Sequence, residues 1–593
     1  MLAFRKKADP DTVYQLGFCK GAQTIDHILT LQTCIEKYVK KQKNRLYCCF
    51  VDYKKAFDSL CREALIYKLI EMGFSGKFLE CIKHMYSNSD ARLKIVKKLS
   101  AKFPIEAGTE QGHPMSPELF KIFVHELSVE LARTEGINTP VLNEVHCSHL
   151  LRADDLVLMA LDKQSLQKMI EVLHGYCSDW GLIVNLSKTA VLIFNRSGKL
   201  LIESHGFIYD GEKIPAVKEY CYLGITFTAS GSTVRTQVQL RQKALRAYFA
   251  MKKYIDPSAI GKDGAVKLFD ALIRPIVSYG HQVWLPSTKG WETTTTEKSP
   301  EVAFKNLATD PLEKLHITYL KWMLQVPRRT SNTAVLGEYG RYPLAIALTK
   351  TTLDYSNRLQ LMDKEGSNNL VRHAFVEQRK LDLNWYCSIR TLTDTHDPQS
   401  QPDGAFDFPN STLCMKRCKD RFKEMWDVAR TSNKKLEFYN SIKSSFEYET
   451  YLNNKNTFDA KLTTLLRSGS HLLNIEKGRH GKYRESRLNR RCPFCTDREQ
   501  LDLLEALPFP SDIVMENEEH VLADCPAYEE IRSQANDKVR EALLQRNFAG
   551  LFQPNIAADS GILARYIFKK RFPDFKFSRH QRKAKKRIER NPP

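Results

Sequence analysis

Short apolar runs alternate with longer stretches of helical spacing in the part of the chain before residue 230. The run LYCCFVDY is rich in β-forming residues and predicts a buried strand that ends at Asp52. Segment 145–160 predicts two strands joined by a turn that carries Asp154 and Asp155. Apolar positions that recur every three or four residues predict helices in the segments 12–45, 62–87, 163–180 and 234–255.

Further strands complete the pattern of this region. GLIVNLSKTAVLIF and YCYLGITF predict strands, and residues 91–106 predict a hairpin. Because helices are interleaved with antiparallel strands, the pattern predicts an α+β fold rather than a doubly wound sheet. After residue 230 helical spacing prevails, and turn-rich segments occur at 286–300 and 394–412.

Three carboxylates stand where predicted strands end. If those strands are neighbours in one sheet, Asp52, Asp154 and Asp155 meet at one edge of it. Such a group can hold two divalent metal ions about 4 Å apart, an arrangement that stabilises both oxygens of an in-line phosphoryl displacement. An isolated Asp-Asp pair is also typical of a turn or a helix cap, so the metal interpretation depends on Asp52 as well.

The composition favours a polyanionic partner. The 593 residues indicate several domains and carry 90 Lys and Arg against 69 Asp and Glu, a net charge of +21. The sequence has no apolar run of about 18 residues and no signal-peptide core, so we expect no membrane span and no secretion. Fifteen scattered cysteines indicate reduced thiols in an intracellular protein, cytoplasmic or nuclear.

A second group of side chains has metal-ligand spacing. Cys492, Cys495, His520 and Cys525 follow the pattern C-x2-C-x24-H-x4-C. Three thiolates and an imidazole suit tetrahedral Zn²⁺, and four protein ligands make the site structural. The alternative is that the four side chains belong to an ordinary core. The neighbouring KGRHGKYRESRLNRR favours phosphate contacts that are independent of sequence and sensitive to salt.

Taken together, the motifs resemble those of a known family. FVDYKKAFDSL, GTEQGHPMSPELF, RADD, WGLIVNLSKTAVLIF and YLGITF follow the order, and nearly the spacing, of motifs A to E of reverse transcriptases. GFCKGAQTIDHI ahead of them and the cysteine–histidine group are similar to the non-LTR, LINE-like retrotransposon branch. The resemblance implies a right-hand polymerase (partial fingers, palm and thumb), then a mostly helical C-terminal region with a small zinc-binding module. It also implies an N-terminally truncated chain that lacks the endonuclease domain.

The implied activity is RNA-directed DNA polymerisation, in which a primer 3′-hydroxyl is extended with dNTPs on an RNA template. Template RNA and primer or target DNA are the implied partners. On this basis we expect six regions: partial fingers and palm at 1–228, thumb-like helices at 229–285, a linker at 286–300, a helical post-thumb region at 301–475, a zinc-knuckle-like module at 480–535 and a basic tail at 536–593.

The resemblance also assigns roles to single residues. Asp52 and Asp154 correspond to the direct ligands of two Mg²⁺ (or Mn²⁺) ions, with Asp155 in support, and Mg²⁺ prefers such hard oxygen ligands. Lys188 matches a lysine that reaches the leaving phosphate or donates a proton, whereas the alternative is a plain surface lysine. Phe57 matches the bulky side chain beneath the incoming sugar, which selects deoxynucleotides, whereas the alternative is a core residue.

Three further groups of residues match positions that line the substrates. They are the backbone of Lys55 and Ala56 along the triphosphate, Gln111 and Gly112 beside the nucleotide and the templating base, and Tyr222, Leu223 and Gly224 at the primer strand.

Three residues depart from the family pattern. Arg152 stands where the family has an aromatic residue before Ala-Asp-Asp, and Cys19 and Glu110 replace arginines. Upstream finger motifs are also missing. These departures favour a second hypothesis, a catalytically inactive, retrotransposon-derived protein that still binds nucleic acid.

Two other polymerase-like functions share the palm. A splicing factor similar to group II intron maturases is disfavoured by the zinc module and the post-thumb region. An RNA-directed RNA polymerase is disfavoured by Phe57, because a ring at that position clashes with a ribose 2′-hydroxyl.

Overall fold

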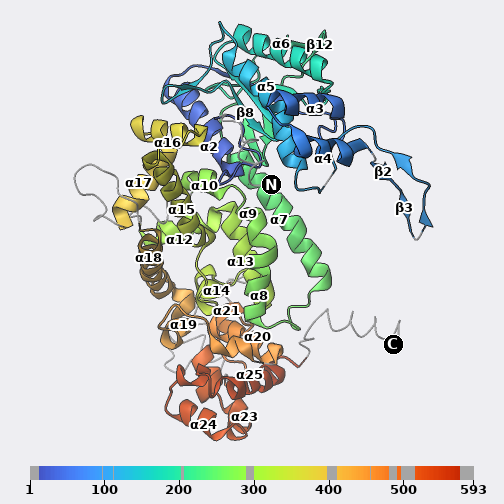
Figure 1. Ribbon diagram of the computed structural model, residues 1–593. Coiled ribbons are helices and arrows are strands. Elements are labelled where there is room, and N and C mark those ends of the chain that lie inside the picture. Colours follow the sequence, from blue (N-terminus) through green and yellow to red (C-terminus); the bar gives the residue numbers. More distant parts are fainter. Residues whose placement is uncertain are drawn as a thin grey trace. The chain divides into compact units, whose positions relative to one another are not determined.

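The computed structural model describes residues 13–87, 89–96, 98–110, 112–201, 206–288, 291, 299–396, 410–454, 456–477, 479, 490–495 and 514–573. The chain forms two compact units, each built from segments that are far apart in sequence (Figure 1). Unit 1 comprises Met1–Gln239, Gly280–Thr295 and Leu348–Met415, and unit 2 comprises Leu240–Tyr279, Thr296–Ala347 and Lys416–Pro593.

The centre of unit 1 is a four-stranded antiparallel sheet with the strand order β10-β1-β9-β8. Its strands are β1 (Leu46–Val51), β8 (His149–Arg152), β9 (Asp155–Ala160) and β10 (Ala190–Phe194). Every residue of β1 is buried, because both faces of the sheet are covered, and this explains the continuous apolar run LYCCFV. The predicted strands at these four segments are confirmed.

Alternate residues of the sheet enter two different packing layers. On one face, Cys49 and Leu158 belong to a hydrophobic cluster with residues of four helices. These helices are α3 (Arg62–Glu71), α4 (Gly76–Ser87), α5 (Ser116–Arg133) and α6 (Lys163–Trp180). On the other face, the ring of Phe50 stacks on Tyr220 of a separate hairpin at a centroid distance of 4.4 Å.

Local signals set the ends of these helices. Asp162 accepts a hydrogen bond from the Ser165 amide at the start of α6, and Gly181, with a φ of 72°, ends it. The helix predicted for 62–87 is divided into α3 and α4 at Gly73, which has a φ of 75°. The helix predicted within 12–45 is α2 (Thr24–Cys34), and a π-helical segment, Ile35–Lys41, continues it.

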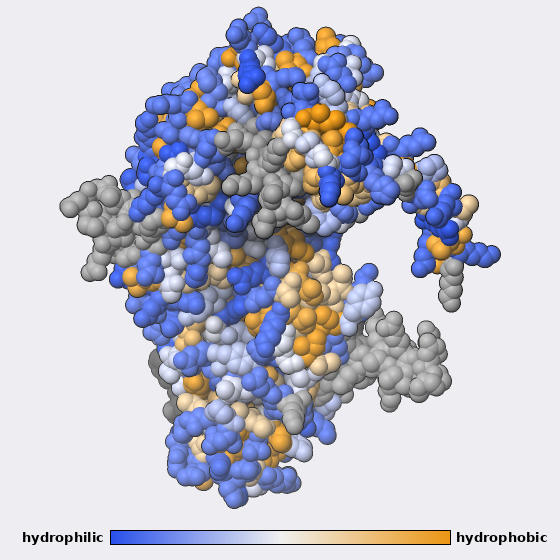
Figure 2. All heavy atoms as spheres, viewed as in Figure 1, coloured by the Kyte–Doolittle hydropathy of each residue, from blue (hydrophilic) through white to orange (hydrophobic). Residues whose placement is uncertain are grey.

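Short strand pairs complete unit 1. They are β2 (Asp90–Ala91) with β5 (Phe103–Pro104), β3 (Lys94–Ile95) with β4 (Lys98–Leu99), β6 (Val141–Leu142) with β7 (Val145–His146), β11 (Ile208–Tyr209) with β12 (Glu212–Lys213), and β13 (Glu219–Tyr222) with β14 (Ile225–Thr228). The hairpin predicted at 91–106 is confirmed; it projects from the helices (Figure 1) and bears both apolar and hydrophilic residues (Figure 2). Val145 and His146 pair with β6, so the first strand of the predicted 145–160 pair begins only at His149.

Helices from the middle of the chain pack on α2. They are α10 (His281–Trp284), α15 (Leu344–Lys364) and α16 (Leu370–Lys380), and α17 (Asn384–His396) packs in turn on α16. The Gln378 amide on α16 donates hydrogen bonds to Thr33 (3.1 Å) and to Glu36 (3.0 Å) in the buried interface with α2 and its π-helical continuation. Part of the helical region predicted at 301–475 therefore folds together with the sheet.

Unit 2 is helical in its described residues. Its described α-helices are α7 (Val234–Tyr254), α8 (Lys262–Leu268), α9 (Arg274–Val277), α12 (Pro300–Thr309), α13 (Pro311–Leu324), α14 (Asn332–Glu338), α18 (Ser411–Thr431), α19 (Glu437–Ile442), α20 (Thr457–Arg467), α21 (Asn474–Lys477), α23 (Glu529–Ser533), α24 (Asp537–Leu544) and α25 (Ala557–Arg571), of which α7 and α18 begin in unit 1. The helix predicted at 234–255 is confirmed as α7. A buried ion pair joins Arg467 to Glu338 at 3.0 Å, and the Glu338 carboxylate also accepts the Tyr451 hydroxyl.

In the part of the chain that the structure describes, no helix has both the length and the apolar character needed to cross a membrane.

Candidate active site and cysteine–histidine cluster

The three predicted carboxylates lie at one end of the sheet of unit 1. β1 and β9 are antiparallel neighbours, and Val51 lies opposite Leu156, so Asp52 comes next to Asp155 at the strand ends. Arg152 and Asp155 face each other across the β8–β9 hairpin, whose two-residue turn is Ala153–Asp154. A φ of 56° at Ala153 closes this turn. Strand pairing thus gathers all three carboxylates at one sheet edge.

The local electrostatics of this edge favour a cation. Burial raises the pKa of Asp155 to about 6, and the charges of Asp154 and Asp52 add to the rise. Burial and the Asp52 charge also raise the pKa of Asp154. Like charges held close together in a partly buried site destabilise their own ionised forms. A bound dication removes that repulsion, so these side chains have the charge and the oxygen donors of a divalent-metal site.

Arg152 is a basic residue two positions before Asp154. Its charge lowers the pKa of Asp155, although the effect of burial is larger. The same charge lowers the pKa values of Tyr222 and His27, so the guanidinium lies among these three side chains. One of its terminal nitrogens is buried and has no hydrogen-bond partner among the described residues. A cation therefore occupies the place that an aromatic side chain takes in the family pattern.

Asp52 is held by the segment that precedes β10. Asn185 donates its side-chain amide to Asp52 Oδ2 at 2.9 Å and its backbone N–H to the Asp52 carbonyl at 2.7 Å. The Asp52 N–H donates to Thr189 Oγ1 at 3.1 Å. Lys188 Nζ lies 3.7 Å from Asp52 Oδ2, with a side chain that is 67% exposed. Asn185 was not predicted as a site residue. The sequence feature that could have identified it is a side-chain amide placed between two apolar segments that border the carboxylate edge.

A second residue that the motifs do not identify is Gln15. Segment 14–16 runs beside β8, where the Leu16 N–H donates to the Leu151 carbonyl at 3.0 Å. Gln15 Oε1 accepts the N–H of Gly17 (2.6 Å) and that of Ala153 in the carboxylate turn (3.2 Å). Gly17 approaches so closely that a Cβ there would lie 2.3 Å from the Ala153 nitrogen. The N-terminal segment thus supports the turn that carries Asp154.

The residues expected near the nucleotide occupy the loop after β1 and the start of α5. Phe57 is half-buried, and its ring stacks on Phe120 at a centroid distance of 4.3 Å. Ala56 is buried, whereas Lys55 is exposed and has a φ of 50°. Gly112 is exposed with a φ of 86°, which favours glycine. Gln111 lies outside the described residues.

The expected primer-grip residues form a hairpin turn. Leu223 and Gly224 join β13 to β14 with positive φ values of 46° and 79°. Tyr222 is buried, with its hydroxyl 3.3 Å from His27 Nδ1. Its neighbour Tyr220 donates its hydroxyl to the Lys188 carbonyl at 3.2 Å, and burial together with the charges of Asp52 and Asp155 raises the Tyr220 pKa to about 12. The hairpin therefore lies beside the carboxylate edge.

Unit 2 brings the four predicted cysteine and histidine ligands together. One ligand atom from each of Cys492, Cys495, His520 and Cys525 lies within 4.8 Å of every other, a grouping that could hold a metal ion. Cys492 Sγ and Cys525 Sγ are 3.8 Å apart, and Cys495 Sγ is 3.4 Å from His520 Nε2. Burial and the neighbouring thiols raise the pKa of Cys495 to about 12, so an added cation is needed to stabilise its thiolate.

Comparison with known proteins agrees with this geometry. A profile of the family described as reverse transcriptase (RNA-dependent DNA polymerase) matches residues 4–227. The Pol polyprotein of the type-2 retrotransposable element R2DM of Drosophila melanogaster is 28% identical over 223 residues, 37% of this chain and 21% of that protein. The RNA-directed DNA polymerase of the mobile element jockey of Drosophila funebris is 24% identical over 241 residues, 40% of this chain and 25% of that protein. The chain thus spans about a fifth to a quarter of the length of these relatives.

Among solved structures, apo telomerase from Candida tropicalis is similar at a TM-score of 0.31 and 11% identity, over 63% of this chain and 60% of that chain. The family profile covers the sheet, the three carboxylates and the β13–β14 turn. The two relatives named above are proteins of mobile elements. Residues 4–227 therefore match the reverse transcriptase family, and the chain is similar to proteins of non-LTR retrotransposons such as R2 and jockey.

Proposed function

We propose that the chain is an active RNA-directed DNA polymerase that extends a primer 3′-hydroxyl with dNTPs on an RNA template. The observation that supports this most directly is the meeting of Asp52, Asp154 and Asp155 at one edge of the sheet, with the pKa values of Asp154 and Asp155 raised by burial and mutual repulsion. All three metal-binding carboxylates of the family pattern are therefore present and adjacent. Template RNA and primer or target DNA are the proposed partners.

The donor set fits two Mg²⁺ or Mn²⁺ ions, which need hard oxygen ligands. When bound at these carboxylates, the ions would lower the pKa of the primer hydroxyl and neutralise charge on the transferred phosphate. Asn185 keeps Asp52 oriented, because its amide fixes one carboxylate oxygen. Exposed Lys188 is close enough to Asp52 to reach a phosphate beside it. Phe57 is braced by Phe120 and presents a rigid ring toward the sugar, with Lys55, Ala56, Gln111 and Gly112 as the remaining nucleotide contacts.

The test is incorporation of dTTP on poly(rA)/oligo(dT) with Mg²⁺, by the purified chain and by an Asp154→Ala, Asp155→Ala double variant. We expect incorporation by the parent chain and none by the double variant, because two of the three ligands are removed. Omission of poly(rA) controls for terminal addition that needs no template. A folded parent chain that incorporates no dTTP contradicts the proposal.

The second hypothesis is an inactive protein that binds nucleic acid, and the observation that favours it is the Arg152 guanidinium near Asp155. An Arg152→Tyr variant tests whether this cation causes inactivity. Incorporation that appears only in this variant assigns inactivity to the cation beside the metal site. Inactivity of both chains, with RNA binding retained, supports the second hypothesis and shows that Arg152 alone is not the cause.

We further propose that Cys492, Cys495, His520 and Cys525 bind one structural Zn²⁺. A tetrahedral zinc with Zn–S bonds of about 2.3 Å holds its sulfur atoms about 3.8 Å apart. The Cys492–Cys525 separation of 3.8 Å and the Cys495–Cys525 separation of 3.5 Å fit that spacing. We also propose that the chain works in the cytoplasm or the nucleus, where thiols stay reduced. None of its fifteen cysteines is in a disulfide in the structure.

A further inference from the structure

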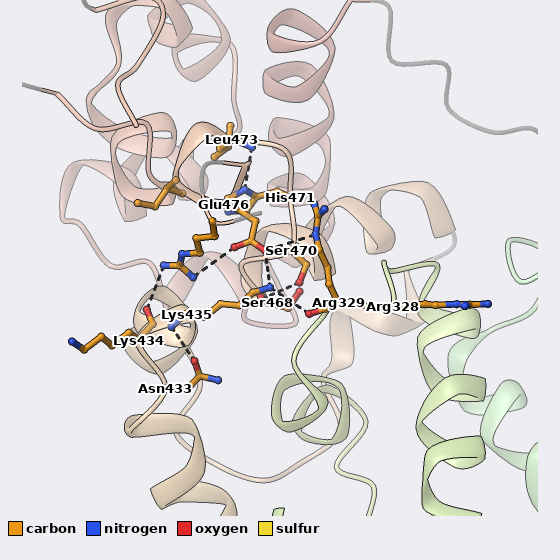
Figure 3. Close-up of polar contacts among 12 residues, drawn as sticks. Arg328, Arg329, Asn433, Lys434, Lys435, Ser468, Ser470, His471, Leu473 and Glu476 are labelled. Atoms are coloured by element: carbon orange, nitrogen blue, oxygen red, sulfur yellow. Dashed lines mark hydrogen bonds and ion pairs between the residues drawn. The ribbon is translucent and has the colours of Figure 1, made fainter. Parts of the chain in front are cut away.

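A row of basic side chains crosses unit 2 where the loop after α13, the loop after α18 and the end of α21 meet. Its members, called here the basic row, are Lys321, Arg328, Arg329, Lys434, Lys435 and Arg479. Figure 3 shows Lys434 and Lys435 on one side, Arg329 beyond Glu476, and Arg328 at the other end. Arg479 belongs to the basic segment KGRHGKYRESRLNRR, and the other five residues lie outside the motifs discussed above.

Hydrogen bonds and ion pairs fix the centre of the basic row. Lys435 Nζ donates to the buried Glu476 carboxylate at 2.6 Å, and Arg329 Nε and Arg479 Nη1 lie 3.8 Å and 3.6 Å from the same carboxylate. Glu476 is only 1% exposed, so it acts as an internal anchor for three cations. This anchor holds the charges in place without covering the solvent-exposed ends of the row.

Backbone carbonyls tie the two loops to the same centre. Lys321 Nζ donates to the Arg328 carbonyl at 2.9 Å, and Lys435 Nζ lies 3.4 Å from the Arg329 carbonyl. Arg479 donates to the Lys434 carbonyl at 3.5 Å. The backbones of Arg328 and Lys434 are therefore held, while their side chains are exposed and point away from these contacts in Figure 3.

Among the residues that the structure describes, ion pairs neutralise only part of the positive charge in the row. Glu476 pairs with three of the six cations, and the nearby Glu518 is already hydrogen-bonded to His471 at 2.8 Å. Among the described residues, no ion pair is formed by the side chains of Arg328 and Lys434. Burial lowers the pKa of Lys321 to about 8, and the charge of Lys435 lowers it further. Cations that destabilise one another in this way gain free energy from an added polyanion.

We propose that the basic row binds the sugar–phosphate backbone of RNA or DNA without regard to base sequence. The choice of polyanion rests on the proposed function, which supplies nucleic acid as the partner. An extended line of Lys and Arg with held backbones fits successive phosphates, and phosphate contacts of this kind position a nucleic acid without specifying its sequence. The row then gives unit 2 a nucleic-acid contact of its own.

The test removes the two unpaired charges at the ends of the row in the full chain. Arg328→Ala, Lys434→Ala is compared with Lys416→Ala, Lys538→Ala, which removes the same charge from exposed lysines on α18 and α24. Lys416 lies about 22 Å along α18 from the end nearest to Lys434, at 1.5 Å per residue. The probes are single-stranded oligo(rU) and a duplex DNA of unrelated sequence, titrated by fluorescence anisotropy at several KCl concentrations.

The slope of log affinity against log salt is negative. In the Arg328→Ala, Lys434→Ala variant we expect its magnitude to decrease by about 1.4 with the RNA or about 1.8 with the duplex DNA, and in the control variant we expect no change. An effect on one probe only identifies which nucleic acid occupies the row. Unchanged slopes with both probes, or equal losses in the control variant, overturn the proposal. Binding is measured without dNTPs, so loss of slope in a chain that fails to polymerise supports the row while contradicting the proposed activity.

Discussion

At the residue scale, the contact between Gly17 and the carboxylate turn gives a sharp test of how Asp154 is positioned. A Gly17→Ala methyl would lie 2.3 Å from the Ala153 nitrogen and 2.8 Å from Gln15 Oε1, so the turn has to move. A displacement near 1 Å at a catalytic group can reduce a rate on the order of 100-fold. We expect dTTP incorporation to fall by about that factor in Gly17→Ala, while the circular dichroism spectrum of the protein stays unchanged.

The matched control for that prediction is Gly175→Ala on α6. A Cβ at Gly175 meets no atom within 4 Å, and alanine is the better helix former by about 1 kcal/mol. This variant is therefore expected to keep full activity. If the Gly17→Ala variant incorporates dTTP at the rate of the parent chain, the prediction is wrong and the turn tolerates the displacement.

The sequence predicts where the three carboxylates lie, but it does not predict the residues that hold them in place, and the reason is physical. Asp52, Asp154 and Asp155 end apolar strands, so strand pairing alone brings them together. The Gln15 contact with Ala153 depends on how a short segment runs beside β8, and no period in the sequence encodes that path. Asn185 is similar, because its role follows from a bend next to Asp52 rather than from its own chemistry.

At the element scale, α2 is joined to α15 by a buried charge. Asp26 on α2 is fully buried; it pairs with Arg358, which is 22% exposed, and accepts the Tyr355 hydroxyl at 3.0 Å. Removal of one partner of a buried pair leaves an uncompensated charge and costs about 3–5 kcal/mol. We expect Arg358→Met to lower the free energy of unfolding of unit 1 by about that amount, measured by urea-dependent hydrogen exchange of α2 peptides.

The control for Arg358→Met is Arg390→Met. Arg390 and Asp382 form an ion pair at 3.1 Å with side chains that are 45% and 61% exposed. Exposed pairs contribute about 0–1 kcal/mol, so the control variant should change exchange in α2 very little. If the two variants have equal effects, Asp26 does not depend on Arg358.

Pairing of α15 and α16 with α2 also marks the limit of prediction from the pattern of elements. Spacing of apolar residues predicts that the middle of the chain is helical, and the structure confirms helices there. The same spacing does not say which partner each apolar face meets. The polar contacts that decide it, such as Gln378 with Glu36, join residues more than three hundred positions apart.

Two buried histidines make unit 1 sensitive to acid. Burial lowers the pKa values of His27 on α2 and His149 on β8 to about 3, from an ordinary 6.5. The unfolded chain therefore takes up these protons first as the pH falls, and the stabilisation present above pH 6.5 is lost between pH 6.5 and 3, at about 1.4 kcal/mol per pH unit for each group. We expect the thermal midpoint of the chain to fall across the accessible part of this window.

A His149→Asn variant isolates one of these contributions. Asp155 titrates in the same range with the opposite sign, because its folded pKa of about 6 lies above the ordinary 3.8. That contribution is common to the parent and the variant and cancels in the comparison. The midpoint of His149→Asn should depend less steeply on pH between 6.5 and 4.5, whatever its value at pH 7. An equal slope in both chains shows that His149 is protonated in the folded state.

At the scale of the whole molecule, the cysteine–histidine cluster links distant parts of unit 2. Cys492 and Cys525 belong to one hydrophobic cluster with Leu466 of α20 and Leu563 of α25. A metal held by the four ligands would therefore stabilise α20 and α25 as well as the short segments that carry the ligands. Without the metal, the high pKa of Cys495 keeps its thiol protonated and the cross-link between segments is lost.

We predict one zinc ion per purified chain, measured by mass spectrometry of the metal, and its loss in Cys525→Ser. Cys81→Ser, which changes an exposed thiol on α4, should keep the zinc.

Extraction with a chelator should increase hydrogen exchange in 514–533 and in α25. Zn²⁺ but not Mg²⁺ should restore protection, because only the softer ion suits three thiolates. Affinity should fall as the pH falls, since binding releases thiol protons. A chain that purifies without zinc, and whose exchange is unchanged when zinc is added, has an ordinary core at this position.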